Sequence, residues 1–430
     1  MMIGKVQFSR WAILLMVVLF SSAVGLATIQ NQSPEQQYTK AKELQQQGNY
    51  QDAAKLFLKV IGTKSADASA VAGSLSQIQA CYRSLRNEGE IDSAIDEAIE
   101  QHGGKPEVLA AAAETLRRSS HYGYLVDGAF YRGYNQRQRV YGAAIQCSEQ
   151  DRLRSMNLLL KAIELTDADR GDLYIKLADA ILIGRNNKQA WRLQSLSDLD
   201  KEPDYTQLDQ QSSFAYMDAP VDDEGNPIVY SIPDGLESAQ SDGERYRWAL
   251  EQANSTTSKY QARLRWANFL SSQFSVATLS QSFWGAGGSN KGTRDAMGQL
   301  HELAEDETIA KLADGIKRFK PAPEFNAVKI YKDLIEEVDI GSYRRSAVNK
   351  LANIYMNRRQ YPKAAETIEL DLSSFGDAQK LLDSIRGPQL QFDPSKPLQA
   401  GEKGEISMLF RNAKQVDFTI RRIDMEKLLT

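Results

Sequence analysis

This chain is poor in the side chains that most often carry catalytic or metal-binding chemistry. Its 430 residues include three histidines and two cysteines. His102, His121 and His301 lie far apart, and none has a second metal ligand at helical spacing, so we interpret them as solvated residues. Two cysteines, Cys81 and Cys147, are too few for a disulfide scaffold, and we expect both to be small buried hydrophobic residues in helical surroundings.

The chain also lacks an excess of basic charge. Its net charge is −4, from 52 basic and 56 acidic residues. No basic block of the kind that binds phosphate is present, so we expect no nucleic-acid partner. A chain of 430 residues with 42% apolar content has room for two or three domains with a large core.

Three short motifs suggest chemistry, and each lacks a residue that the chemistry needs. GAGGSNKG at 285–292 has no Ser or Thr after its lysine, as a phosphate loop requires, so we expect a flexible loop. Asp222–Gly225 lacks the alternating oxygen ligands of a calcium loop and predicts a turn. Cys147–Gln150 has the spacing of an internal thioester, but Ser148 stands where the ring needs glycine, and we expect a helix start. The sequence predicts no catalytic, cofactor-binding or metal-binding residue.

The N-terminus has the three regions of a secretory signal peptide. Lys5 and Arg10 precede an apolar run at 11–20, and small residues follow up to Ala27. The run is shorter than the roughly 20 residues of a spanning helix. We expect cleavage after Ala27 and an exported protein in the periplasm, the cell envelope or the medium. An uncleaved segment would instead tether the chain to a membrane.

Helical repeats begin after a polar spacer. In residues 36–61 the small residues Ala41 and Ala53 let two helices approach closely, and Gly48 marks the turn between them. Phe57 fills the remaining gap. This is the pattern of a tetratricopeptide (TPR) helix pair.

Similar spacing recurs three times along the chain. The matching residues are Leu85, Gly89, Ile91 and Ala94; Ala178, Ile181 and Ala190; and Ala352, Tyr355, Tyr361 and Ala364. Because the copies do not follow a fixed 34-residue period, we predict a mostly α fold built as an irregular TPR-like helical-repeat array. Residues 197–235 read as a loop or short hairpin, and a further helix is expected to start near Asp306.

The C-terminal segment 404–424 predicts a β-hairpin instead of a helix. Its two strands alternate polar residues with Ile406, Met408 and Phe410, and with Val416, Phe418 and Ile420. An isolated hairpin is marginal in water, so we interpret it as the start of a truncated β-sandwich domain. We expect an exposed apolar stripe through Met408 and Phe418, and weak anchoring to the helices.

The order of these segments resembles the N-terminal portion of large bacterial alpha-2-macroglobulin-like proteins. The segments that carry the resemblance include DRLRSMNLLLKAIEL, APVDDEGNPIVYSIP and GEKGEISMLFRNAKQVDFTIRRIDMEKLL, with Arg411, Asn412, Val416, Phe418 and Asp424 at the start of a macroglobulin-like domain. Proteins of this family inhibit proteases by entrapment, using a bait region and a thioester. This chain lacks both regions, so the resemblance implies a fragment or truncated product of a longer protein.

These observations together predict five segments. They are a signal peptide at 1–27, TPR-like repeats at 28–200, a loop or hairpin insertion at 201–240, a second helical-repeat region at 241–386, and a linker with the start of a macroglobulin-like β domain at 387–430. We expect a non-enzymatic exported scaffold without a cofactor, whose partner is a macroglobulin-like domain, an envelope protein or a protease. The alternatives are a module that takes direct part in protease inhibition and an unrecognised enzyme built on an α-solenoid.

Overall fold

The protein is mostly helical. A computed structural model describes residues 32–133, 142–185, 190–207, 219–274, 300–339, 341–392, 403–404 and 408–419. Across these residues the chain forms 13 α-helices and small antiparallel sheets, which confirms the predicted mostly α class. The predicted signal peptide, the loop at 285–292, and Ile406, Ile420 and Asp424 lie outside the described residues.

The chain divides into two compact units. The first comprises Met1–Phe274 with Ala310–Gly315, and the second comprises Ser275–Ile309 with Ile316–Thr430. No helix in the described part of either unit is long and apolar enough to cross a membrane.

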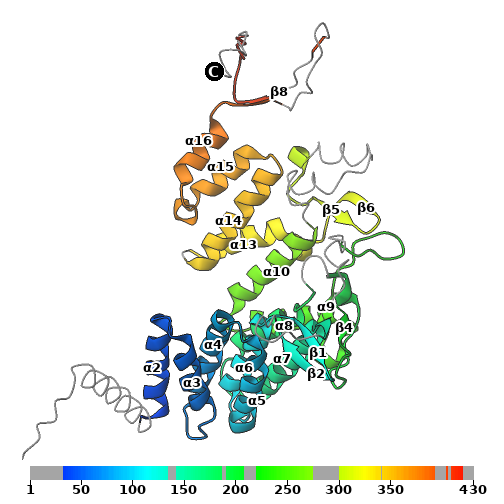
Figure 1. The fold of residues 1–430 in the computed structure, drawn as a ribbon. Helices are drawn as coiled ribbons and strands as arrows, with labels where there is room; N and C mark the ends of the chain where they lie inside the picture. Colours follow the sequence, from blue (N-terminus) through cyan, green and yellow to red (C-terminus); the bar gives the residue numbers. More distant parts are fainter. Residues whose placement is uncertain are drawn as a thin grey trace, which may run out of the picture. The chain divides into compact units, whose positions relative to one another are not determined.

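The first unit opens with helices that pack on their neighbours in chain order (Figure 1). These elements are α2 (Pro34–Gln46), α3 (Tyr50–Ile61), α4 (Ala68–Leu85), the 3-10 turn η1 (Glu88–Glu90), α5 (Ile91–His102) and α6 (Pro106–Arg118). The chain between α2 and α3 reverses at Gly48, whose φ of +80° favours glycine. Ala41, Ala53 and Phe57 are completely buried, as the helix-pair pattern predicts.

A four-stranded antiparallel sheet interrupts the helices, where the sequence pattern had predicted helix. Its strands are β1 (Tyr122–Val126), β2 (Ala129–Arg132), β3 (Ala143–Gln146) and β4 (Thr206–Gln207), in the order β2-β1-β3-β4. Asp127 and Gly128 connect β1 to β2 with φ angles of 49° and 80°. An Asp-Gly turn with two positive φ angles matches the twist of a tight hairpin, and this local signal favours strands over helix.

The helices of the first unit continue after the sheet. They are α7 (Ser148–Glu164), α8 (Gly171–Ile181), the 3-10 turns η2 (Ala190–Gln194) and η4 (Leu236–Ser238), α9 (Asp242–Asn254) and α10 (Lys259–Phe274). Ala178 and Ile181 are buried on α8 as expected, but Ala190 lies in a 3-10 turn and not in a second α-helix. The predicted turn at Asp222–Gly225 is confirmed, because the Asp222 carboxylate accepts hydrogen bonds from the backbone of Glu224 and Asn226.

The described residues after α10 form a hairpin and then four α-helices (Figure 1). Its elements are η5 (Leu300–Glu302), β5 (Thr308–Leu312), β6 (Gly315–Phe319), η6 (Pro323–Phe325), α13 (Ala327–Glu337), α14 (Ser342–Asn357), α15 (Tyr361–Glu369), η7 (Leu372–Ser374) and α16 (Ala378–Arg386). The predicted helix pair is present as α14 and α15, with Ala352, Tyr355 and Ala364 buried. The prediction of a helix near Asp306 is wrong, because the chain there leads into strand β5. A tight turn joins β5 to β6, and it ends at Gly315, whose φ of +131° favours glycine.

The C-terminal hairpin is paired differently from the sequence prediction. Strand β8 (Met408–Arg411) is present as expected, but it pairs antiparallel with β7 (Gln389–Phe392). Residues 416–419, the expected partner, form no strand. The polar–apolar alternation of Gln389–Phe392 is therefore a strand signal that lies inside the segment interpreted as a linker.

The hairpin is also better anchored than predicted. The Arg411 guanidinium stacks 3.6 Å from the ring centre of Tyr361, and Asn412 donates a 2.8 Å hydrogen bond to a carbonyl at the end of α16. Phe418 is 59% exposed, as predicted, whereas Met408 is half-buried. The polar residues of the motif Arg411–Asn412 thus tie β8 to the helices before it.

Candidate binding groove

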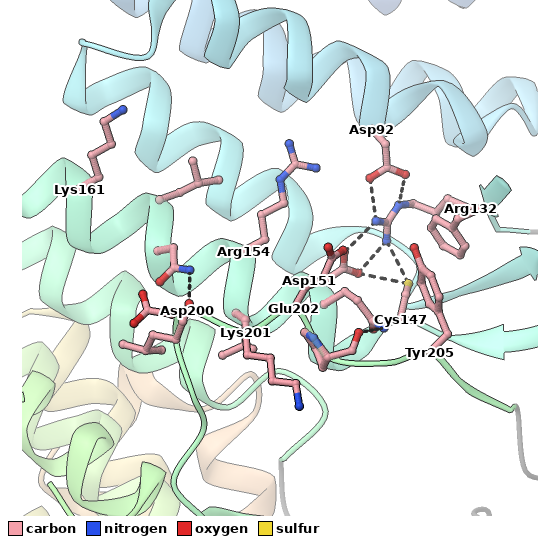
Figure 2. Close-up of a pocket in the computed structure, with 17 residues that line it drawn as sticks. Asp92, Arg132, Cys147, Asp151, Arg154, Lys161, Asp200, Lys201, Glu202 and Tyr205 are labelled. Atoms are coloured by element: carbon pink, nitrogen blue, oxygen red, sulfur yellow. Dashed lines mark hydrogen bonds and ion pairs between the residues drawn. The ribbon is translucent and has the colours of Figure 1, made fainter. Parts of the chain in front are cut away.

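A groove of about 720 Å³ follows helix α7 in the first unit (Figure 2). It is lined by Asp92, Phe130, Arg132, Cys147, Gln150, Asp151, Leu153, Arg154, Asn157, Leu158, Lys161, Leu199, Asp200, Lys201, Glu202, Pro203 and Tyr205. The α7 residues run from Gln150 to Lys161, which at 1.5 Å per residue is about 16 Å of helix. We call this cavity the α7 groove. Its length matches about five residues of extended chain.

One wall of the groove is a non-helical segment held by α7. This segment, Leu199–Pro203, is called the strap below. Gln150 Nε2 donates a 3.0 Å hydrogen bond to the Pro203 carbonyl, and Asn157 Nδ2 donates a 2.9 Å bond to the Leu199 carbonyl. Residues seven positions apart lie on one face of a helix. Two amides of α7 therefore hold the backbone of the strap at both ends.

The other wall is aromatic and comes from the sheet. The Phe130 ring of β2 stacks on Tyr205, with ring centres 5.4 Å apart and an interplanar angle of 24°. The guanidinium of Arg132 lies 5.4 Å from the centre of the Phe130 ring. Offset-stacked aromatic side chains present broad apolar area in a fixed orientation. This end of the groove suits an apolar side chain.

Arg132 forms the charged floor beside the aromatic wall. Its Nη2 lies 2.8 Å from Asp92 Oδ1, and its Nη1 lies 2.7 Å from Asp151 Oδ2 (Figure 2). The Arg132 side chain is 2% exposed and that of Asp151 is 4% exposed. Burial alone would lower the pKa of Arg132, but the hydrogen bonds that it donates to Asp151 and Asp92 outweigh burial and raise the pKa. The arginine is therefore charged at any physiological pH and locks three elements together.

Asp151 is ionised for the same reason. Burial alone would raise the pKa of this carboxyl, but hydrogen bonds from His121 and Arg132 lower it. His121 Nδ1 lies 2.8 Å from Asp151 Oδ2. Both oxygens of Asp151 are occupied by side chains of the protein. The cluster consequently shapes the floor of the groove, and its carboxylate is not free to act as an acid.

Cys147 lines the groove at the junction between β3 and α7. The prediction of helical surroundings for this cysteine is therefore wrong on its β3 side. Its Sγ lies 3.5 Å from Asp151 Oδ2, and the residue is 1% exposed. Burial, and then the charge of Asp151, raise the pKa of the thiol, so it is protonated and a poor nucleophile. The Gln150 amide bonds to the strap, and α7 begins at Ser148, which confirms the predicted helix start.

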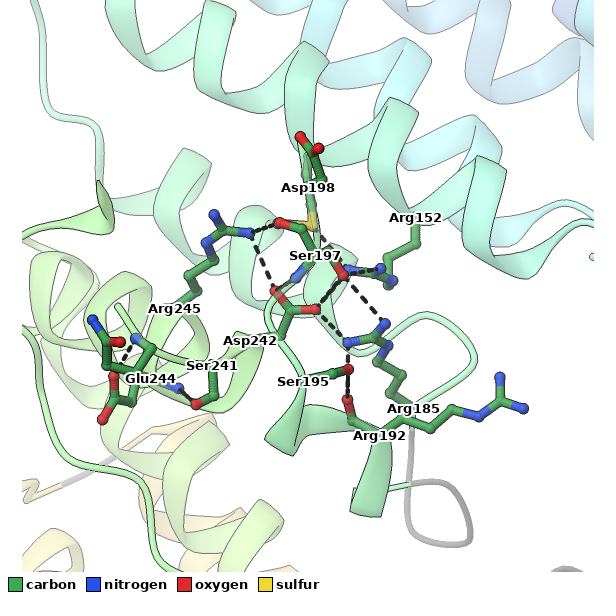
Figure 3. A network of polar contacts seen from close by, with 12 residues as sticks. Arg152, Arg185, Arg192, Ser195, Ser197, Asp198, Ser241, Asp242, Glu244 and Arg245 are labelled. Carbon is green, nitrogen blue, oxygen red and sulfur yellow. Dashed lines mark hydrogen bonds and ion pairs between the residues drawn. The ribbon is translucent and has the colours of Figure 1, made fainter. Parts of the chain in front are cut away.

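A second charged cluster is centred on Asp242 (Figure 3). Asp242 is completely buried at the start of α9 and contacts three arginines: Arg152, at 3.2 Å, Arg245, at 3.3 Å, and Arg185. Glu149 adds a second carboxylate, 2.8 Å from Arg152 and 3.0 Å from Arg185. The cluster therefore joins α7, α9 and the turn after α8 through paired side chains that are buried or nearly so.

The Asp242 cluster fixes the chain that leads into the strap. Ser197 donates to Asp242 through its hydroxyl, at 2.6 Å, and through its backbone N–H, at 3.2 Å. Arg245 Nη1 donates a 2.6 Å bond to the Ser197 carbonyl. Ser197 lies two residues before Leu199. The strap is thus held by α7 along its length and by the Asp242 cluster at its entrance.

The three histidines differ from the prediction that all are solvated. His102 is 3% exposed, with its Nε2 2.9 Å from the Ile61 carbonyl, and His121 is half-buried against Asp151. Only the prediction for His301 is correct. Within the described ranges, no group of three His, Cys, Asp or Glu residues is placed to hold a metal ion. Both cysteines are free and buried, as expected.

Two cations of the groove remain open to a ligand. Lys161 and Lys201 are exposed, and neither has an ion-pair partner in the part of the chain that the structure describes. None of these groove residues was predicted as a site from the sequence, although the Asp-Gly turn before β2 was a signal for the sheet that supplies the aromatic wall. No protein-family model and no curated protein matches this chain.

Proposed function

We propose that this chain is an exported, non-enzymatic scaffold that binds an extended segment of a partner protein in the α7 groove. The observation that carries the proposal is the strap, whose backbone carbonyls at Leu199 and Pro203 are bound by two amides of α7. About 720 Å³ of space lies beside it, within the usual range of ligand pockets. An extended segment of the partner lying beside the strap would fill this space.

The lining indicates the chemistry of that segment. Phe130 and Tyr205 offer an apolar surface at one end. Lys201 lies between Asp200 and Glu202 in the strap, whereas the exposed Lys161 on α7 favours an acidic side chain farther along. We therefore propose a ligand segment of about five residues that carries one apolar and at least one acidic side chain.

The rigidity of the groove supports a binding role. The floor is held by Arg132 with its two carboxylates, and the strap is held by the Asp242 cluster. A preformed groove loses less conformational freedom when a ligand binds, so more of the contact energy appears as affinity.

The architecture and the resemblance suggest which partner the scaffold serves. Small buried residues at successive helix contacts, such as Ala41 and Ala53, are typical of TPR-like arrays, which commonly bind proteins. The resemblance to the N-terminal portion of bacterial alpha-2-macroglobulin-like proteins favours a macroglobulin-like domain as the partner, with an envelope protein or a protease as the other candidates.

Selection from random peptides tests this proposal whatever the partner is. Displayed random decapeptides are selected on the full chain, on Lys161→Glu/Lys201→Glu and on the control Lys55→Glu/Lys59→Glu, which makes the same charge change on an exposed face of α3. We expect a shared acidic–apolar motif on the wild type and the control, and its loss on the groove variant. The absence of any enriched motif, or the same motif on all three proteins, would overturn the proposal.

A further inference from the structure

The second unit holds one of its own carboxylates between two lysines. Glu305 Oε2 lies 2.5 Å from Lys332 Nζ on α13, and Glu305 Oε1 lies 3.1 Å from Lys363 Nζ on α15. The Tyr355 hydroxyl on α14 lies 3.5 Å from the same carboxylate. We call Lys332, Tyr355 and Lys363 the Glu305 seat. Three consecutive helices contribute to it, so a single carboxylate group contacts all three.

The backbone beside Glu305 is held by side-chain amides. Gln360 Nε2 donates a 2.6 Å hydrogen bond to the Leu303 carbonyl, and Asn326 Nδ2 donates a 2.8 Å bond to the Glu305 carbonyl. The Leu303 side chain is 3% exposed. Residues 303–305 are therefore held by two backbone contacts, one buried leucine and one paired carboxylate. Repeat proteins commonly recognise an extended peptide through contacts of these kinds.

The seat opens into a cavity that Glu305 does not fill. This cavity of about 520 Å³ is lined by the seat together with Ile335, Glu336, Arg344, Leu351, Glu366, Thr367 and Leu370. The side chains of Glu305, Lys332 and Lys363 are 44%, 37% and 40% exposed. Glu305 thus lies at an accessible mouth. Ion pairs at this exposure are weak, so an outside carboxylate can replace it.

The charges around the cavity limit what it accepts. With Glu305 displaced, Lys332, Lys363 and Arg344 face Glu336 and Glu366, which leaves one uncompensated positive charge. Arg344 also donates to the carbonyl of Val338, at the end of α13. One carboxylate therefore matches the charge of the seat, whereas a segment with several acidic residues would be repelled by Glu336 and Glu366.

We infer that helices α13–α15 bind a Leu-x-Glu segment of a partner protein, and that residues 303–305 of this chain occupy the same seat as a built-in competitor. The two amide contacts and the carboxylate seat are the contacts of residues 303–305, and the leucine takes the place of Leu303, which is buried beside Leu300 and Ile309. This site is separate from the α7 groove and does not depend on the function proposed for it.

Peptide binding to the full chain tests the inference. The probe is a fluorescein-labelled HELAEDE peptide, the sequence of residues 301–307, measured by fluorescence anisotropy on the wild type and on Glu305→Gln. Weakening the built-in competitor raises the fraction of open seats, so we expect about fivefold tighter binding to Glu305→Gln. Adding Lys332→Gln and Lys363→Gln to that variant should abolish the gain. The control is Glu302→Gln, an exposed neighbour outside the seat, which should leave affinity unchanged.

A second peptide separates specific seating from general charge attraction. The peptide HELAQDE differs only at the position of Glu305, and we expect it to bind at least fivefold more weakly to Glu305→Gln and to the wild type. Equal binding of the two peptides, or equal affinity of Glu305→Gln and Glu302→Gln for HELAEDE, would overturn the inference. If Glu305→Gln fails to fold by circular dichroism, the two peptides still decide the question on the wild-type chain.

Discussion

Arg132 and Asp151 join strand β2 to helix α7 through two hydrogen bonds of 2.7 Å, one from each Nη nitrogen to a separate carboxylate oxygen. Both side chains are at most 4% exposed. A two-bond pair of this kind fixes the direction of the arginine as well as its distance. The aromatic wall of the α7 groove therefore depends on a charged contact made across 19 residues of sequence.

Replacing Asp151 by asparagine should strongly destabilise the first unit. The change leaves the buried charge of Arg132 with Asp92 as its only carboxylate, and breaking a buried pair costs about 3–5 kcal/mol. Urea unfolding followed by the fluorescence of Trp248 and Trp266 measures the free energy of unfolding. The matched control is Asp96→Asn, because Asp96 pairs with Arg154 at 64% exposure and should cost less than about 1 kcal/mol. Equal losses in the two variants would contradict the account.

Acid should destabilise the first unit through the same carboxylate. Its hydrogen bonds to His121 and Arg132 outweigh burial and hold the pKa of Asp151 below its usual value. A depressed folded-state pKa adds stability above the unfolded-state pKa of about 3.9, and this stability is lost as the pH falls further. We expect the free energy of unfolding to drop as the pH falls below about 5, and to drop less in Asp151→Asn. An equal drop in both proteins would show that other groups control the acid response.

Both cysteines should resist thiol reagents in the folded chain. Burial raises the pKa of Cys81 to about 11, and burial together with the charge of Asp151 raises that of Cys147. We expect negligible labelling by a disulfide reagent at pH 8 in the native state and two labelled thiols per chain in urea. Ser76→Cys, which adds an exposed thiol on the same helix as Cys81, should label quickly and serves as the control. Rapid native labelling of the wild type would contradict the buried positions.

Gly243 should tolerate no side chain. A Cβ at this position would lie 2.3 Å from Cδ1 and 2.5 Å from Cγ of Tyr230, so the new methyl group would overlap the tyrosine ring. Gly243→Ala should therefore destabilise the first unit by about 2 kcal/mol. Gly235→Ala has open space around the new methyl group and should be nearly neutral. In the double variant Gly243→Ala/Tyr230→Ala the total cost should be less than the sum of the singles, and strict additivity would exclude the clash.

The sequence predicted those elements whose contacts and turn lie within one short segment. The pair α2–α3 was predictable because Ala41, Gly48 and Ala53 fall at the contacts and the turn of one short segment. The sheet was missed although Asp127–Gly128 is a hairpin turn, because the flanking aromatic residues also suit a helix face. The strand partner of β8 was missed because it lies in a segment rich in proline and glycine.

The candidate groove could not have been predicted in the same way. Arg132 meets a carboxylate 40 residues before it, and Asp242 meets Arg152 across 90 residues. Buried charged residues follow no helical or strand period, so the sequence shows them only as ordinary polar positions. Cys147 and Gln150 were singled out as a failed thioester, and both line the groove for unrelated reasons.

Photo-crosslinking from inside the groove tests the central claim most directly. Benzoylphenylalanine is placed at Lys161, at Lys201 or at the control position Lys55 of the full chain, and the crosslinked peptides are mapped by mass spectrometry after exposure in cells. We predict that one contiguous segment of a single partner protein, carrying an apolar and an acidic residue, crosslinks to Lys161 and Lys201 but not to Lys55. No adduct at either groove position, or the same proteins at all three positions, would contradict the proposed binding role.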